Sequence, residues 1–161
     1  MIFDLRPPDT AGPLRLGATS KDTDRVLHTL GTPLLLCGTA GTRAGWGIER
    51  PSGLFVAAWF DTDDRVDTLE FGGPTGAGDV VTYDTIDVFA TPADELLDAL
   101  RARTTVVEID EEDGSSYLAP DLRLTLWRPP TPAAPDDIDD RFIASIGLSK
   151  SIEPHKIKKE A

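Results

Sequence analysis

Few side chains in this 161-residue sequence could act as a nucleophile or a base. The histidines are His28 and His155, and the one cysteine is Cys37. A nucleophilic triad needs a base beside its nucleophile, and a reactive thiol needs a nearby cation or helix N-terminus. Cys37 ends an apolar run without a basic neighbour, and His28 adjoins Leu27 in an expected helix. We therefore predict no catalytic residues, a buried and unreactive Cys37, and a surface or boundary position for His28.

Carboxylates gather in three short segments, 61–64, 110–113 and 136–140. A calcium loop needs oxygen ligands at alternating positions, a turning glycine and a distal glutamate, and none of the three has that complete spacing. Aspartate is common in hairpin turns because its side chain bonds the nearby backbone. We expect solvated turns and no metal site. Seven of these residues are candidate contacts for a protein partner: Asp61, Asp63, Asp64, Asp110, Glu111, Glu112 and Asp113.

The glycine-rich stretch 72–78 does not form a phosphate-binding loop, because no Gly-Lys-Ser/Thr leads from it into a helix. We interpret it as a linker, and we expect no cofactor. Among the aromatic residues, Trp46 and Tyr117 adjoin expected loops and are candidate anchors for a partner. Trp59 and Trp127 lie in strong strand patterns, where a core position is expected and a role as binding anchors is the alternative.

The charge balance favours a basic partner. The chain has 28 acidic residues against 16 basic ones and a net charge of −12, which repels nucleic acids and anionic membranes. Acidity also serves solubility alone. The longest apolar block, 54–60, is too short to span a bilayer, and the N-terminus lacks a signal-peptide pattern. With a single cysteine besides, the expected location is the cytoplasm, without nucleic-acid or membrane partners.

Two segments have the pattern of amphipathic helices. Thr19 or Ser20 can cap the first, which carries apolar residues on one face and ends at Gly31. In the second, Thr91 is expected to cap and Pro92 to take the first helical position.

Strand patterns follow each expected helix. Residues 54–60 and 66–71 flank an acidic turn and predict a hairpin, whereas 38–47 is expected to be a loop. Further strands are expected at 104–109, near Tyr117, at 122–127 and at 141–146. The predicted fold class is α+β, with two similar halves, each a helix packed on an antiparallel β-meander. These halves, about 1–73 and 79–148, form a single domain at 1–148, followed by a lysine-rich tail at 149–161 that is flexible or appended.

The residues around the first helix carry a resemblance. Leu14-Arg15-Leu16-Gly17-Ala18-Thr19, followed by a helix and Leu30-Gly31-Thr32-Pro33, resembles the start of a module found in the outer-membrane assembly lipoprotein BamE and its relatives. The β-lactamase inhibitory protein has that module in duplicate. The chain is also similar to immunity proteins encoded beside polymorphic toxins. The resemblance implies tandem helix-plus-sheet units and a sheet surface that binds protein, but no further motif matches, so no binding residue is carried over. Without paired cysteines or a signal peptide, we do not expect inhibition of a secreted β-lactamase.

We therefore expect a non-enzymatic protein-binding protein, of the immunity or inhibitor type, that neutralises a basic toxin or enzyme domain through its acidic sheet face and turns. One alternative is a small-molecule-binding or enzymatic α+β domain with a pocket between helix and sheet. A second is an interaction subunit of a biosynthetic or secretion system.

Overall fold

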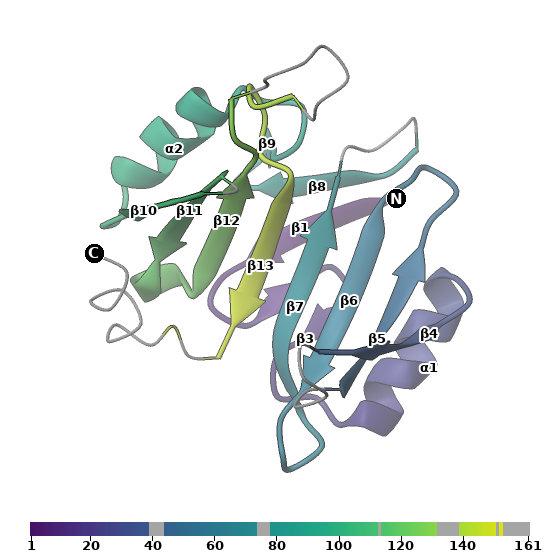
Figure 1. The fold of residues 1–161 in the computed structure, drawn as a ribbon. Coiled ribbons are helices and arrows are strands. Elements are labelled where there is room, and N and C mark those ends of the chain that lie inside the picture. The colour runs from purple at the N-terminus through teal and green to yellow at the C-terminus, as the bar shows by residue number, and fades with distance from the viewer. Residues whose placement is uncertain (39–43, 74–77, 113, 132–138, 151, 153–161) are drawn as a thin grey trace.

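The computed structural model describes residues 1–38, 44–73, 78–112, 114–131, 139–150 and 152, and it confirms the α+β class (Figure 1). The helices are α1 (Ser20–Leu30) and α2 (Ala93–Arg101), with a short 3-10 turn at Pro120–Leu122. The strands of the first part of the chain are β1 (Ile2–Arg6), β2 (Thr10–Ala11), β3 (Leu14–Arg15), β4 (Leu34–Cys37), β5 (Ala44–Glu49), β6 (Phe55–Phe60) and β7 (Val66–Gly72). Those of the second part are β8 (Val80–Tyr83), β9 (Ile86–Asp87), β10 (Val107–Glu111), β11 (Gly114–Ala119), β12 (Leu124–Arg128) and β13 (Ser145–Ser149).

The larger sheet has eight strands in the order β10-β11-β12-β13-β7-β6-β5-β4, and every neighbouring pair is antiparallel. The predicted hairpin of β6 and β7 is confirmed. The strands that follow α1 and those that follow α2 meet where β7 pairs with β13, with Leu69 opposite Leu148. One continuous sheet therefore spans both parts of the chain.

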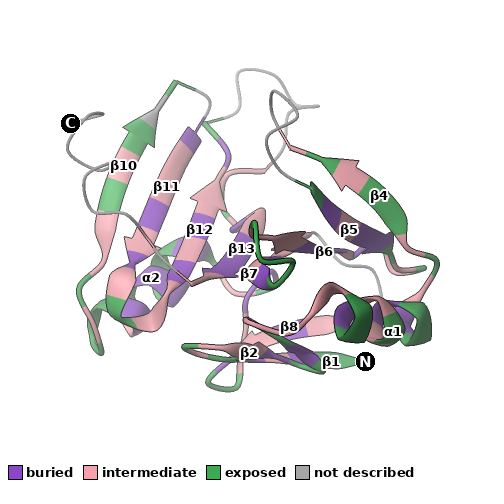
Figure 2. Ribbon diagram, turned by 90° about the horizontal axis from the view of Figure 1, so that it is seen from below, coloured by how far each residue is buried: buried purple, intermediate pink, exposed green. Residues whose placement is uncertain are grey.

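The smaller sheet has the order β3-β2-β1-β8-β9, and its central strands β1 and β8 run parallel. It lies with α1 and α2 on one side of the larger sheet (Figure 1). Seen from below, the outer strands of the larger sheet rise on the opposite side, so that this uncovered side is concave (Figure 2). We call the two sides of the larger sheet the covered face and the open face.

Helix α1 begins and ends at the predicted residues. The Thr19 side chain accepts a hydrogen bond from the backbone N–H of Asp22 at 3.2 Å, which satisfies one of the free donors of the first turn. Leu27 and Leu30 are buried, and the Gly31 N–H closes the last turn on the Leu27 carbonyl.

Helix α2 is confirmed, but its cap differs from the prediction. The helix begins at Ala93, Pro92 stands at the N-cap, and no side chain caps it, so the proposed role of Thr91 is wrong. The carboxylate of Asp87 bonds the backbone N–H groups of Phe89 and Ala90 just before the helix. These bonds turn the chain from β9 toward α2, a role that the helix pattern did not indicate.

The core lies between the larger sheet and the layer formed by the smaller sheet and the two helices. Its largest fully buried side chains come from both sheets, both helices and the β5–β6 turn: Phe3, Phe71, Leu27, Ile48, Leu54, Leu69, Leu96, Leu97, Leu100, Leu124, Leu126 and Ile146. Phe3 of β1 contacts Phe71 of β7 with ring centroids 5.5 Å apart, which couples the two sheets.

Three further expectations are wrong. Residues 44–47 belong to β5 and not to a loop, and the last strand is 145–149 and not 141–146. Ser149 therefore pairs with Thr68 inside the sheet. Cys37 is exposed and not buried, because β4 is an edge strand and the Cys37 side chain lies near the end of it.

Within the described part of the chain, no helix combines the length and the apolar character that crossing a membrane requires.

Candidate binding face of the large sheet

Strand alternation divides the large sheet into two chemically different faces. Residues of β6 and β7 that point to the covered face include Val56, Ala58, Leu69 and Phe71, all of which are fully buried. Their neighbours in the chain point to the open face. Read through the strand pairing, the open face carries these described residues: Val107, Ile109, Gly114, Ser116, Leu118, Thr125, Trp127, Ser145, Gly147, Ser149, Thr68, Glu70, Gly72, Phe55, Ala57, Trp59, Gly45, Gly47, Glu49, Leu34 and Leu36.

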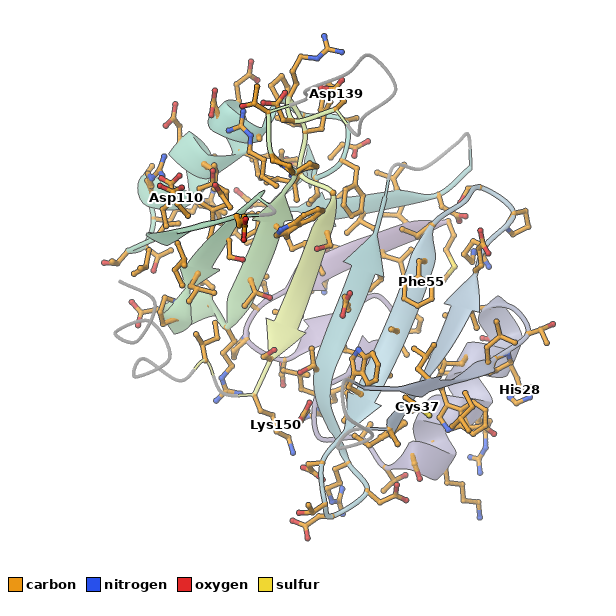
Figure 3. All side chains as sticks on the ribbon, viewed as in Figure 1. His28, Cys37, Phe55, Asp110, Asp139 and Lys150 are labelled. Carbon is orange, nitrogen blue, oxygen red and sulfur yellow. The ribbon has the colours of Figure 1, made fainter. Side chains whose placement is uncertain are left out.

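Three aromatic side chains stand on the open face. Phe55, Trp59 and Trp127 are each half-buried. Phe55 is seen on β6 in Figure 3. The expectation that Trp59 and Trp127 belong to the core is wrong, because their strand positions direct them away from the helices. Partly exposed aromatic groups in a concave surface are typical of protein-binding anchors.

Two glycines of β5 make room for these large groups. A Cβ atom at Gly45 would lie 2.9 Å from the Trp59 ring, and a Cβ atom at Gly47 would lie 2.8 Å from a methyl of Leu36. Because real Cβ atoms do not approach so closely, the glycines allow the neighbouring side chains to lie flat across the strand. The run Ala44-Gly45-Trp46-Gly47 is thus a strand with close packing.

Glu70 lies near the centre of the open face. Its neighbours on the adjacent strands are Gly147 and Ala57, which have little or no side chain. The Trp59 indole N–H donates a hydrogen bond to Glu70 Oε2 at 3.3 Å. Glu70 and Trp127 line one hollow of about 310 Å³, together with hydroxyl groups from four strands. A half-exposed carboxylate therefore stands beside two indoles in a shallow depression.

The charge of the open face is entirely acidic in the residues described. Its carboxylates are Glu49 and Glu70, and its strand positions include no lysine or arginine. The Glu111 side chain lies outside the described residues. A cationic partner surface would complement this face.

The acidic turns lie at opposite ends of the sheet. The β6–β7 turn contains Asp61, Asp63 and Asp64, and the β10–β11 turn contains Glu112 after Asp110. Because β10 and β7 run in the same direction, the end of β10 is far from the start of β7. Figure 3 shows Asp110 at the far end from Lys150, which pairs with Asp61. The turns therefore do not form one acidic patch with each other, and Asp113 lies outside the described residues.

Asp61 has a structural role in its turn. It accepts hydrogen bonds from the backbone N–H groups of Asp63 and Arg65 and from Lys150 Nζ at 3.1 Å. These donors, led by the Arg65 N–H, hold the pKa of Asp61 below its ordinary value. Asp64 accepts a hydrogen bond from the Ser20 hydroxyl. Asp63 and Glu112 are exposed, which leaves them available for a partner.

The two predicted aromatic anchors do not lie on the open face. Tyr117 is 4% exposed and belongs to the core, so it is not available as a surface contact. Trp46 is half-buried and pairs with Ala58 of the covered face. Sequence reasoning missed Phe55 and Glu70. Glu70 lies between the apolar Leu69 and Phe71, which is a weak sign that it points away from the core. Residues 54–60 are all apolar, so no alternation indicates the face on which Phe55 lies.

A second hollow, of about 650 Å³, lies beside the start of α1 and the ends of β4, β5 and β6. Its lining includes Trp46, Leu35 and Phe60 together with the carboxylates of Asp61, Asp64 and Asp67. The hollow thus lies between α1 and the large sheet, where the alternative function would place its pocket. No histidine or cysteine lines it within the residues described.

Among the described residues, the histidine and the cysteine lie at the surface, and His155 lies outside the described residues. His28 is exposed on α1, where its Nδ1 is 2.8 Å from the backbone oxygen of Asp24, and Cys37 is exposed on β4 (Figure 3). Within the described residues, no group of three or more histidine, cysteine, aspartate or glutamate side chains is placed to hold a metal ion.

An ion pair between Arg50 and the buried Asp79 has a structural role. Arg50 donates to both carboxylate oxygens of Asp79, at 3.2 and 2.9 Å, and to the Leu30 carbonyl at 2.6 Å. The Ser52 hydroxyl also donates to Asp79 at 2.5 Å. Chiefly through Arg50, these donors lower the pKa of Asp79 to about 2. The contact connects the end of α1, the β5–β6 turn and the smaller sheet.

No known protein family, no curated protein and no solved structure matches this chain.

Proposed function

We propose that this chain is a non-enzymatic protein-binding protein of the immunity or inhibitor type, which neutralises a basic partner by holding it on the open face of the large sheet. The observation that carries the proposal is the composition of that face. It combines half-buried aromatic groups, Phe55, Trp59 and Trp127, with carboxylates and with no lysine or arginine in its described strand positions.

The size and shape of the open face support this proposal. Eight antiparallel strands form a continuous concave surface on this side of the sheet. A fold that needed only to cover its core would have no use for two indoles on the solvent side. Large aromatic groups are enriched among the anchors of protein interfaces.

The order of elements supports a tandem origin for this surface, as the resemblance implies. Strands β3 and β9 are the two edges of the smaller sheet, and each precedes a helix that is followed by four strands of the larger sheet. We propose that the two parts are related helix-plus-meander units whose sheets join at β7 and β13. In this arrangement a partner contacts both units at once.

Affinity capture with matched baits tests the proposed function. The baits are the unmodified chain, a Trp59→Ala/Trp127→Ala variant, and an Ile2→Ala variant that shortens a 67% exposed apolar side chain outside the large sheet. We expect the unmodified chain and Ile2→Ala to retain the same basic protein from a lysate of the source cells. The double variant should lose it while keeping its melting transition. Retention of that protein by the double variant, or an acidic partner, would contradict the proposal.

The alternative function rests on the second hollow. A small-molecule-binding domain would use Trp46, Leu35 and Phe60 there. Trp46→Phe then becomes the informative variant: it would abolish ligand-induced stabilisation under the alternative, whereas under our proposal it leaves partner capture intact.

A further inference from the structure

The hollow on the open face has a specific chemical character. Its lining supplies the Glu70 carboxylate, the hydroxyls of Ser116, Thr125 and Ser145, and the Trp127 ring. These groups offer hydrogen-bond acceptors and an aromatic surface. Within the described residues, the hydrogen bond that Glu70 accepts comes from the Trp59 indole N–H, and it uses one of the two carboxylate oxygens.

Steric access to Glu70 is provided by its neighbours. On one side lies Gly147, and on the other lies Ala57, so no long side chain flanks the carboxylate within its own cross-strand row. Ser145 precedes Gly147 by two positions on β13, and Thr68 precedes Glu70 by two positions on β7. Glu70 itself is half-buried and lines the hollow, so a partner group that enters the hollow can reach its carboxylate.

A guanidinium group fits these features. It is planar, carries five N–H donors and no acceptor, and stacks on an indole ring. An anionic group would be repelled by Glu70, and the described open face has no lysine or arginine to receive it. A neutral amide would leave the carboxylate without a counter-charge.

We propose that the hollow receives one arginine side chain of the partner, which pairs with Glu70 and stacks against Trp127, with Trp59 orienting the carboxylate through its indole N–H. This inference rests on the proposed function and names the group by which the basic partner is recognised. Glu70 then selects a partner with an arginine at this position, whereas the aromatic side chains of the open face supply contact area.

A small probe tests the hollow without the partner. The ¹⁵N-labelled chain is titrated with N-acetyl-arginine-N-methylamide while the indole N–H signals of the three tryptophans are followed. We expect saturable shifts for Trp59 and Trp127 but not for Trp46, which belongs to the covered face. The citrulline analogue, which has the same shape without the charge, should cause no such shifts.

Two matched variants complete the test. Glu70→Gln should raise the dissociation constant of the arginine probe about tenfold, as loss of a charge-assisted hydrogen bond implies. Glu49→Gln removes a charge from the same face outside the hollow and should change it by less than about twofold. Equal binding of the citrulline analogue, equal effects of the two variants, or no saturable shift would overturn the inference.

The two proposals fail separately. If the arginine probe does not bind but the Trp59→Ala/Trp127→Ala variant still loses the captured protein, only the recognition of arginine is wrong. If the probe binds but capture does not depend on these tryptophans, the proposed binding face is wrong.

Discussion

The two faces of the large sheet are made from the same strands but differ in residue composition and burial. On the covered face, β6 and β7 present Val56, Ala58, Leu69 and Phe71, all with 0% exposure. On the open face, the intervening positions hold aromatic groups, a glutamate and small residues. The covered face is explained by folding, since each side chain removes apolar surface from water. The open face is not explained in this way.

This difference indicates what each face is for. A solvent face that served only the fold would carry charged and β-branched polar side chains, as antiparallel sheets commonly do. Here the solvent face keeps partly exposed indoles and excludes lysine and arginine from its described positions. We interpret that composition as suited to binding a protein partner.

The largest expected difference between the faces is the effect of a substitution on the free energy of unfolding. Leu69→Ala and Leu34→Ala remove the same atoms from opposite faces, at positions that are 0% and 60% exposed. We expect Leu69→Ala to lower the free energy of unfolding by about 2–5 kcal/mol, because it leaves a cavity in the core. Leu34→Ala should change it by less than about 0.5 kcal/mol. Chemical denaturation of both variants measures the two values, and similar losses would show that the open face is also part of the core.

A comparison of two carboxylates sharpens the same contrast. Asp79 is bound by Arg50 and Ser52 and is 4% exposed, whereas Glu70 stands half-exposed on the open face. Asp79→Asn should therefore destabilise the fold at neutral pH, since it leaves Arg50 without its counter-charge. Glu70→Gln should leave stability nearly unchanged. A larger loss for Glu70→Gln would assign a structural role to the open-face carboxylate.

Asp79 also makes the stability of the fold depend on pH, and the sign of this dependence follows from its lowered pKa. Its pKa is lowered from 3.8 to about 2 in the folded chain, so the folded state binds fewer protons than the unfolded state between these values. The resulting stability of about 2 kcal/mol is present in full above about pH 4 and is lost as the pH falls through 2. Denaturation from pH 5 to pH 2 should therefore show a steeper loss for the unmodified chain than for Asp79→Asn. Parallel curves would contradict this role of Asp79.

Local features of this fold could be predicted from the sequence because they depend on neighbouring residues. The Thr19 cap, the stop at Gly31 and the acidic turn at 61–64 are encoded within a few positions of one another. The same holds for α2, whose apolar spacing is sufficient to locate it even though its N-cap is Pro92 and not Thr91.

The candidate site could not be predicted because it depends on distant pairings. Glu70 adjoins Gly147 only because β7 pairs with β13, and no local pattern indicates this contact across 77 positions of the sequence. Likewise, alternation assigns Trp127 and Tyr117 to opposite faces of neighbouring strands but does not tell which face the helices cover. The sequence therefore favours Tyr117 as an anchor, whereas in the structure Tyr117 is 4% exposed and Trp127 is half-buried on the open face.

The kinetics of binding the captured partner test the central claim most directly. Three proteins are compared: the unmodified chain, Trp127→Ala on the open face, and a variant with Asp63→Asn and Glu112→Gln in the exposed turns at opposite ends of the sheet. Trp127→Ala should raise the dissociation rate about tenfold or more with little change in association. The turn variant should slow association, most clearly at low salt, and leave dissociation unchanged. An unaltered dissociation rate for Trp127→Ala would contradict the claim that the open face of the large sheet holds the partner.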